Sequence, residues 1–225
     1  MNYIGKGIYN ISDIHKITGL HSQSIRRWIK GYDYNYKGEK RHSSQLWMPE
    51  LEPIDDTIGL SFKDLIEINF VQAFIKQGLS LKIIRMALIY AQNKYGIDHP
   101  FCSKKFLTDG RKIFLEIHHK TGEKILEELL KGQLVFKEIV GPFLKQLDFE
   151  NDILKRWWPL TKQKQVVLDP ERNFGQPIVA KEGILTEVLA KAYHVNGSFQ
   201  IVSEWYNVSE ESVSDAVEFQ YRLAA

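Results

Sequence analysis

The sequence contains a single cysteine, Cys102, among 225 residues. One cysteine excludes an internal disulfide and any zinc site built from several thiolates. No apolar run approaches the roughly 20 residues that a membrane-spanning helix needs, and the first ten residues lack the apolar core of a secretory signal peptide. Hydrophobic residues make up 44% of the chain and charged residues 26%, as in soluble globular proteins. We therefore expect a cytoplasmic protein.

Enzyme signatures are also missing. The sequence has no HExxH motif, no Walker A loop and no nucleophile elbow. Two pairs of histidines are badly spaced for a shared metal ion: His15 and His21, and His118 and His119. Asp148, Glu150 and Asp152 could bind Mg²⁺ as nuclease carboxylates do, but a surface turn is the simpler interpretation. We expect no catalytic activity, no metal and no cofactor.

The net charge of +2 hides an uneven distribution along the chain. Residues 15–47 carry seven Lys or Arg against two Asp or Glu, a net charge of +5. Residues 158–225 carry six Lys or Arg against nine Asp or Glu, a net charge of −3. A basic N-terminal part and an acidic C-terminal part favour two different partners, although two solvated surfaces would give the same pattern.

Residues 11–30 predict two short helices joined by a turn. We expect Ser12 to cap the first helix, and His21 or Ser22 to cap the second. Gly19 lies between them and can adopt the positive φ that a tight turn requires. Two short helices joined in this way form a helix-turn-helix.

The second of these helices is amphipathic. Its apolar residues Ile25, Trp28 and Ile29 cluster on one side at 100° per residue. A recognition helix needs such a stripe to seat on its domain while long polar side chains enter the major groove. An ordinary surface helix is the alternative. The candidate DNA-binding residues on the opposite side are Gln23, Arg26, Arg27 and Lys30.

A basic β-hairpin is expected after this helix. Tyr32, Tyr34 and Tyr36 alternate with polar residues, which predicts a strand. A turn at 37–39 and a returning strand would place basic side chains at the hairpin tip, where they can contact phosphates. We expect the tyrosines to pack rather than to stack on bases. The basic candidates of this hairpin are Lys37, Lys40 and Arg41.

Two longer helices follow. We expect one to begin at Ser61 and to stop at Gly78, and the next to be capped by Ser80 and to stop at Gly96.

The stretch from Ile11 to Tyr95 resembles the DNA-binding domain of MerR-type regulators. The matching residues are Ile11, Ile14, Ile17, Thr18, Gly19, Leu20, Ile25 and Arg26, followed by Leu60–Leu88. The resemblance implies a winged helix-turn-helix that binds double-stranded operator DNA. Symmetric operators favour a homodimer. The sequence departs from the family at His15, where a small buried alanine is usual, and at 27–29, where an aromatic pair and an acidic residue are usual.

The middle of the chain, residues 97–160, predicts a short mixed α/β connector that packs or dimerises. Thr108, Asp109 and Gly110 favour a turn between short strands, and Glu123–Lys131 predicts a helix. The paired tryptophans at 157 and 158 favour a domain junction over an exposed partner anchor.

The tail, residues 161–225, predicts a short strand at 166–168 and three helices. We expect Thr186, Ser198 and Ser209 to cap these helices. The second of these helices is expected to run through Ile201, Val202 and Trp205. The last is expected to carry four apolar residues on one face: Val213, Ala216, Val217 and Tyr221.

This tail resembles the small C-terminal domain of VapB-type antitoxins. The residues that carry the resemblance are Gly175, Pro177, Ile178, Val179 and Ser198–Phe219. The sequence departs at 181–183, where relatives commonly have Gly-Thr-Arg. The resemblance implies a strand followed by a three-helix bundle, and a PIN-type ribonuclease toxin as partner.

An acidic tail surface would suit a basic nuclease groove, whereas its negative charge disfavours direct contact with DNA. A solvated helix face is the alternative. The candidate partner-binding residues are Glu204, Glu210, Glu211, Asp215 and Glu218.

We therefore expect a mainly α protein of three parts: a winged helix-turn-helix head with a small β wing (1–96), the connector (97–160) and the antitoxin-like tail (161–225). The function predicted is that of an antitoxin-like repressor that autoregulates its operon and neutralises a PIN-type ribonuclease toxin. An effector-responsive MerR-like regulator without a toxin is the main alternative, and a metal-dependent nuclease is a third.

Overall fold

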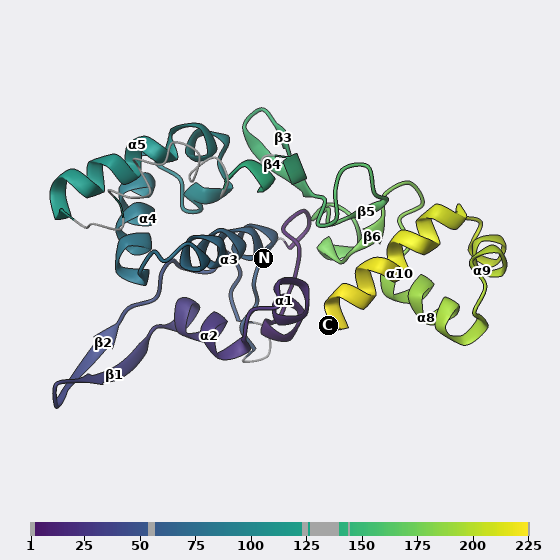
Figure 1. The fold of residues 1–225 in the computed structure, drawn as a ribbon, viewed down its shortest axis with the longest axis horizontal. Helices are drawn as coiled ribbons and strands as arrows, with labels where there is room; N and C mark the ends of the chain where they lie inside the picture. Colours follow the sequence, from purple (N-terminus) through teal and green to yellow (C-terminus); the bar gives the residue numbers. More distant parts are fainter. Residues whose placement is uncertain (1–2, 54–56, 123–125, 127–139, 144, 225) are drawn as a thin grey trace. The chain divides into compact units, whose positions relative to one another are not determined.

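The computed structural model describes residues 3–53, 57–122, 126, 140–143 and 145–224. It is mainly helical, with small antiparallel strand pairs (Figure 1). The chain divides into two compact units. Unit 1 comprises residues 1–8, 145–150 and 155–225, and unit 2 comprises residues 9–144 and 151–154. Within the described ranges, no helix combines the length and apolarity needed to cross a membrane.

Unit 2 begins with two short helices, α1 (Ile11–Thr18) and α2 (Ser22–Lys30). A capping box between Asn10 and Asp13 starts α1, so the expectation that Ser12 caps this helix is wrong. Gly19 ends it with φ 67°. The ring Nδ1 of His21 accepts the Gln23 N–H at 3.2 Å and caps α2, which is one of the two caps predicted.

The hairpin of β1 (Tyr32–Tyr36) and β2 (Glu39–Ser43) has the predicted strand and turn. Tyr36 pairs with Glu39, so only Lys37 and Gly38 form the turn, with φ of 51° and 84°. Two positive φ values match the twist of the flanking strands. The packing expected of the tyrosines is wrong for Tyr34 and Tyr36, which are exposed because the hairpin projects beyond the helices of this unit (Figure 1).

Helices α3 (Phe62–Lys76) and α4 (Leu81–Tyr95) form the centre of unit 2. The predicted caps are confirmed: the hydroxyls of Ser61 and Ser80 accept backbone N–H groups, and Gly96 ends α4 with φ 65°. Nearly every side of α3 is buried, including its polar residues Asp64 and Glu67.

The 3-10 turn η1 (Pro100–Cys102) leads into α5 (Lys104–Thr121). The turn expected around Gly110 is wrong, because this glycine lies inside α5. Apolar residues at helical spacing, including Phe106, Ile113 and Phe114, bury one face of α5 and override the local turn signal. The helix expected over 123–131 lies outside the described residues, apart from position 126.

Short strands precede the helices of unit 1. Strands β3 (Leu147–Glu150) and β4 (Ile153–Trp157) form a hairpin. Strand β5 (Val166–Val167), at the predicted position, pairs antiparallel with β6 (Ile178–Val179) after the 3-10 turn η2 (Asn173–Gly175).

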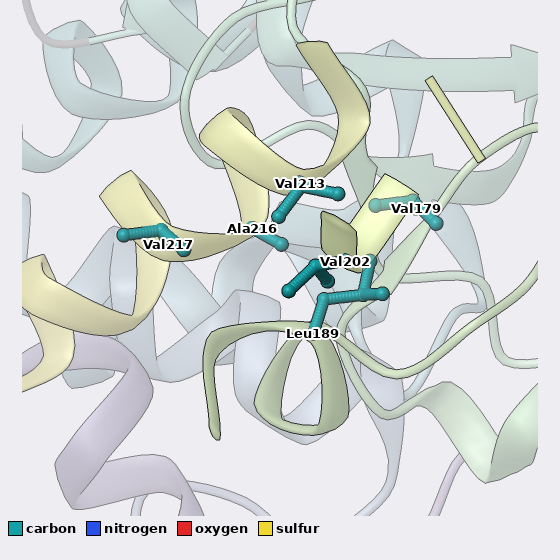
Figure 2. Close-up of a cluster of buried hydrophobic side chains, with 6 residues drawn as sticks. All are labelled: Val179, Leu189, Val202, Val213, Ala216 and Val217. Atoms are coloured by element: carbon teal, nitrogen blue, oxygen red, sulfur yellow. The ribbon is translucent and has the colours of Figure 1, made fainter. Parts of the chain in front are cut away.

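Helices α8 (Thr186–Asn196), α9 (Phe199–Tyr206) and α10 (Glu210–Ala224) complete unit 1. Ser198 and Ser209 cap α9 and α10 as predicted. Thr186 does not cap α8, because its hydroxyl donates to the Pro177 carbonyl instead. The three helices and β6 share a core whose side chains point toward one another in Figure 2: Val179, Leu189, Val202, Val213, Ala216 and Val217.

Candidate nucleic-acid interface and tail surface

The exposed face of α2 is cationic. Ile25, Trp28 and Ile29 are buried as predicted. Because these three side chains point into unit 2, the polar residues between them must point outward. Every charged side chain on this helix is a cation. The predicted DNA-binding residues of α2 are all exposed: Gln23, Arg26, Arg27 and Lys30.

The hairpin carries further exposed cations, the predicted Lys37, Lys40 and Arg41. The Arg41 guanidinium lies 4.7 Å from the centre of the Tyr36 ring and 3.2 Å from the Glu39 carboxylate. Both members of that ion pair are well exposed, so the pair is weak and leaves Arg41 available to an anion.

The base of the hairpin is fixed to α2 and α4. Gly31 joins α2 to β1 with φ 76° and ψ 179°, and a Cβ at this position would lie 2.6 Å from the Ser43 carbonyl oxygen. The Arg27 guanidinium lies 5.1 Å from the centre of the Tyr32 ring. Arg85 of α4 donates to the Ser43 hydroxyl and the Ser44 carbonyl at 3.1 and 2.8 Å. These contacts fix the base of the hairpin beside the cationic face of α2.

A buried polar cluster anchors the N-terminal half of α3. Burial alone would raise the pKa of Asp64, but hydrogen bonds from His99, Ser61 and Trp47 and the charge of His99 hold it below its ordinary value. Burial would lower the pKa of His99, but Asp64 and Glu67 raise it. Burial raises the pKa of Glu67 to about 8. These residues fix the position of α3 relative to η1.

The acidic candidates of the tail divide into two groups. Glu204, Glu210 and Glu211 are exposed. Asp215 is only 1% exposed, and its carboxylate accepts the Gln165 N–H at 2.8 Å and pairs with Lys164 Nζ at 2.9 Å. It therefore holds the 164–165 segment to α10 and does not face a partner, contrary to the prediction. The half-buried Glu218 pairs with Lys164 and Arg222.

The helices of the tail carry exposed apolar side chains. Ile201 and Trp205 are 39% and 63% exposed, on α9, while their neighbour Val202 is buried. Tyr221 of α10 is 61% exposed. The spacing of four between Ile201 and Trp205 puts them on one helix face. Val202 lies in the core cluster, and Phe199 and Tyr206 of the same helix pack against it. Local periodicity shows that face but does not tell whether another helix covers it.

Two of the three acidic residues considered for Mg²⁺ have other partners. Asp148 accepts the Trp158 indole N–H at 2.7 Å and pairs with Lys162 at 2.6 Å. Asp152 lies 3.9 Å from Lys104. In the part of the chain that the structure describes, no group of three His, Cys, Asp or Glu side chains is placed to hold a metal ion.

Comparison with known proteins gives similarities that span nearly the whole chain. No protein-family model matches the sequence. The chain is 25% identical over 222 residues to the Mycobacterium tuberculosis (strain ATCC 25618 / H37Rv) protein named "Putative antitoxin VapB45", covering 94% of this chain and 92% of that protein. The crystal structure of Rv2018 from Mycobacterium tuberculosis has a similar fold, with a TM-score of 0.71 and 22% identity over 93% of this chain and 96% of that one.

Proposed function

We propose that this protein is an antitoxin that binds operator DNA through its head and a toxin through its tail. The observation that carries the proposal is the similarity, over nearly the full length, to a protein named as an antitoxin. We assign DNA binding to residues 1–96, dimerisation to residues 97–160 and toxin binding to residues 161–225. The proposed role is regulatory and involves no catalytic step.

In the head, α1 and α2 act as a helix-turn-helix and the β1–β2 hairpin acts as its wing. The exposed cations of α2 support this assignment, because arginine reads guanine edges and phosphates in the major groove. Gln23 can read adenine. The hairpin cations Lys37, Lys40 and Arg41 contact the phosphate backbone. A homodimer would place two such heads on a symmetric operator.

In the tail, the exposed face of α9 and the first turn of α10 form the toxin-binding surface. Trp205 and Ile201 supply apolar contact area, and exposed tryptophans are frequent energetic centres of interfaces. Glu204, Glu210 and Glu211 give the same surface a negative charge. That charge complements the basic nucleic-acid groove of a ribonuclease, so a PIN-type ribonuclease toxin is the proposed partner.

The experiment is co-expression of the full chain with the product of each adjacent reading frame, followed by purification and mass determination. A stable complex with a growth-inhibiting neighbour is expected. Trp205→Ala should weaken that complex, whereas Tyr221→Ala, which removes a similarly exposed aromatic side chain of α10, should not. A lone dimer that binds its own upstream DNA would contradict the toxin-binding role and favour an effector-responsive regulator.

DNA binding is tested separately with the upstream DNA. Arg27→Ala should cost roughly 1–3 kcal/mol of specific binding. Lys94→Ala, which removes an exposed cation at the far end of α4, is the control. Equal affinities of the wild type and the Arg27 variant would remove Arg27 from the interface.

A further inference from the structure

Unit 2 contains a groove of about 500 Å³ beside the exposed face of α2. Its walls come from α2, the beginning of β1, the last turns of α3 and the turn into α4. Small-molecule sites typically have volumes of about 300–1,000 Å³. The groove is therefore large enough for a ligand with one or two rings.

The charged groups of the groove are cationic. Arg27 of α2 and Lys76 of α3 both line it, and none of the described lining residues is acidic. Ser80 and Leu81, at the N-terminus of the 15-residue helix α4, also line it. The first backbone N–H groups of a helix have no partner inside the helix and carry a partial positive charge. The lining of the groove thus contains two cationic side chains and the first residues of a helix.

The remaining walls are largely apolar. Trp28 and Leu79 are buried residues of the lining, and Ile75, next to Lys76 in the sequence, is 36% exposed. A hydrated inorganic anion would gain little from such walls, because an apolar surface offers it no hydrogen bonds. An anion attached to an apolar ring would use both features, burying its ring against Trp28 and Ile75 while its charge meets Arg27 and Lys76.

We propose that this groove binds a small organic anion: a carboxylate, sulfonate or phosphate group attached to an apolar, ring-sized body. The charged group lies between Arg27 and Lys76, near the first turn of α4. Charge-assisted hydrogen bonds to these two side chains orient the ligand, and the apolar walls select against inorganic anions.

The site has a consequence for regulation that rests on the proposed function. Arg27 lines the groove and also belongs to the face of α2 that we assign to DNA. A ligand anion that engages the Arg27 guanidinium withdraws this side chain from DNA and adds negative charge beside a phosphate-binding surface. Ligand and operator DNA therefore compete.

The binding test uses the full chain without DNA and 1-naphthalenesulfonate as the probe. Titration calorimetry would compare this probe with 1-naphthol, which has the ring without the full charge, and with inorganic phosphate, which has the charge without the ring. The sulfonate should bind at least about tenfold more tightly than either, since charged hydrogen bonds and apolar burial each contribute on this scale. Equal binding of inorganic phosphate would overturn the proposal.

Two variants with matched controls locate the probe. Ile75→Glu places a negative charge in the groove, and Ile89→Glu makes the same change at a 48% exposed isoleucine of α4 that does not line it. Lys76→Gln removes a groove cation, and Lys94→Gln removes one elsewhere. Binding should fall about tenfold or more in the two groove variants alone. Retained binding in both groove variants would overturn the site.

A second titration adds upstream operator DNA, and its outcome separates this inference from the proposed function. Saturating probe should weaken DNA binding by the wild type but not by Ile75→Glu. A probe that binds in the groove without changing DNA affinity would overturn the competition. If the chain binds no DNA at all, the proposed function fails while the first titration still decides the groove.

Discussion

The ring nitrogen Nε2 of His99 lies 3.0 Å from the carboxylate oxygen Oδ1 of Asp64 in the interior of unit 2. The same oxygen accepts the Trp47 indole N–H at 2.7 Å, and Oδ2 accepts the Ser61 N–H at 2.8 Å. One buried carboxylate therefore joins the segment after the hairpin, the N-terminus of α3 and the segment that leads into α5.

Replacing this carboxylate should destabilise unit 2 strongly. Asp64→Asn keeps the size of the side chain but removes the negative charge opposite His99 and replaces one accepting carboxylate oxygen with an NH2 donor. Breaking a buried pair in this way costs roughly 3–5 kcal/mol of unfolding free energy. Urea denaturation of the full chain measures this free energy. Asp109→Asn, the control, breaks the exposed pair with Lys112 and should cost at most about 0.5 kcal/mol. Equal losses of unfolding free energy in the two variants would contradict the prediction.

The stability of unit 2 should fall as pH rises from about 5 to 9. Burial raises the pKa of Glu67 from 4.5 to about 8, so the folded protein keeps a proton that the unfolded chain releases. The stabilisation is complete below about pH 4.5 and is lost as the pH rises toward 8. The raised pKa of His99 also makes the stability fall as the pH rises. The lowered pKa of Asp64 stabilises unit 2 above pH 3.8, its ordinary pKa, and this stabilisation is lost only as the pH falls below that value.

Glu67→Gln tests the origin of this pH dependence. The glutamine cannot ionise, and its carbonyl can still accept the Phe101 N–H that Glu67 Oε1 accepts at 2.8 Å. The Tm of the Glu67→Gln variant should therefore fall less than that of the wild type between pH 5 and pH 9. Glu116→Gln, on the exposed face of α5, should leave the slope unchanged. Parallel declines in the wild type and the Glu67 variant would show that other groups cause the effect.

Asp215 should stabilise the tail and contribute nothing to its surface. Asp215→Ala leaves the partly buried Gln165 N–H without its acceptor and Lys164 without its nearest carboxylate. A hydrogen bond to a charged group is worth about 1.5–3 kcal/mol, and the unfolding free energy should fall by about that much. Glu210→Ala, on the exposed first turn of α10, should change it by no more than about 0.5 kcal/mol. A larger loss from Glu210→Ala than from Asp215→Ala would contradict this assignment.

Features that depend on neighbouring residues alone could be predicted from the sequence. The caps at Ser61 and Ser80, the helix end at Gly96 and the buried stripe of α2 each rest on residues within one or two turns. The predicted hairpin turn at Lys37 and Gly38 is equally local, because its backbone conformation is set by those two residues. The exposure of the predicted α2 cations follows from the same stripe.

Features that depend on residues distant in the sequence could not be predicted from it. Gly110 lies inside α5 because the helix buries an aromatic face against α3 and η1, which no local turn signal reveals. Asp215 and Glu211 look alike in an acidic helix, and only Lys164 and Gln165, some 50 residues earlier, distinguish the buried carboxylate from the exposed one. Likewise, whether Trp205 is covered depends on the packing of three helices.

Gly31 should be the least replaceable of the glycines that join helices to their neighbours in unit 2. Its φ of 76° and ψ of 179° lie in a region that only glycine adopts readily, and a Cβ would meet the Ser43 carbonyl oxygen at 2.6 Å. Gly31→Ala should therefore cost about 3 kcal/mol or more of unfolding free energy. Gly96→Ala is the matched control, because Gly96 also has positive φ but has open space around its Cβ position, and its cost should be about 1 kcal/mol.

Since Gly31 sets the direction of the hairpin relative to α2, Gly31→Ala should also weaken operator binding at temperatures where the variant is folded, whereas Gly96→Ala should not. Similar losses in the two variants would show that the close approach to Ser43 is not what makes glycine necessary at position 31.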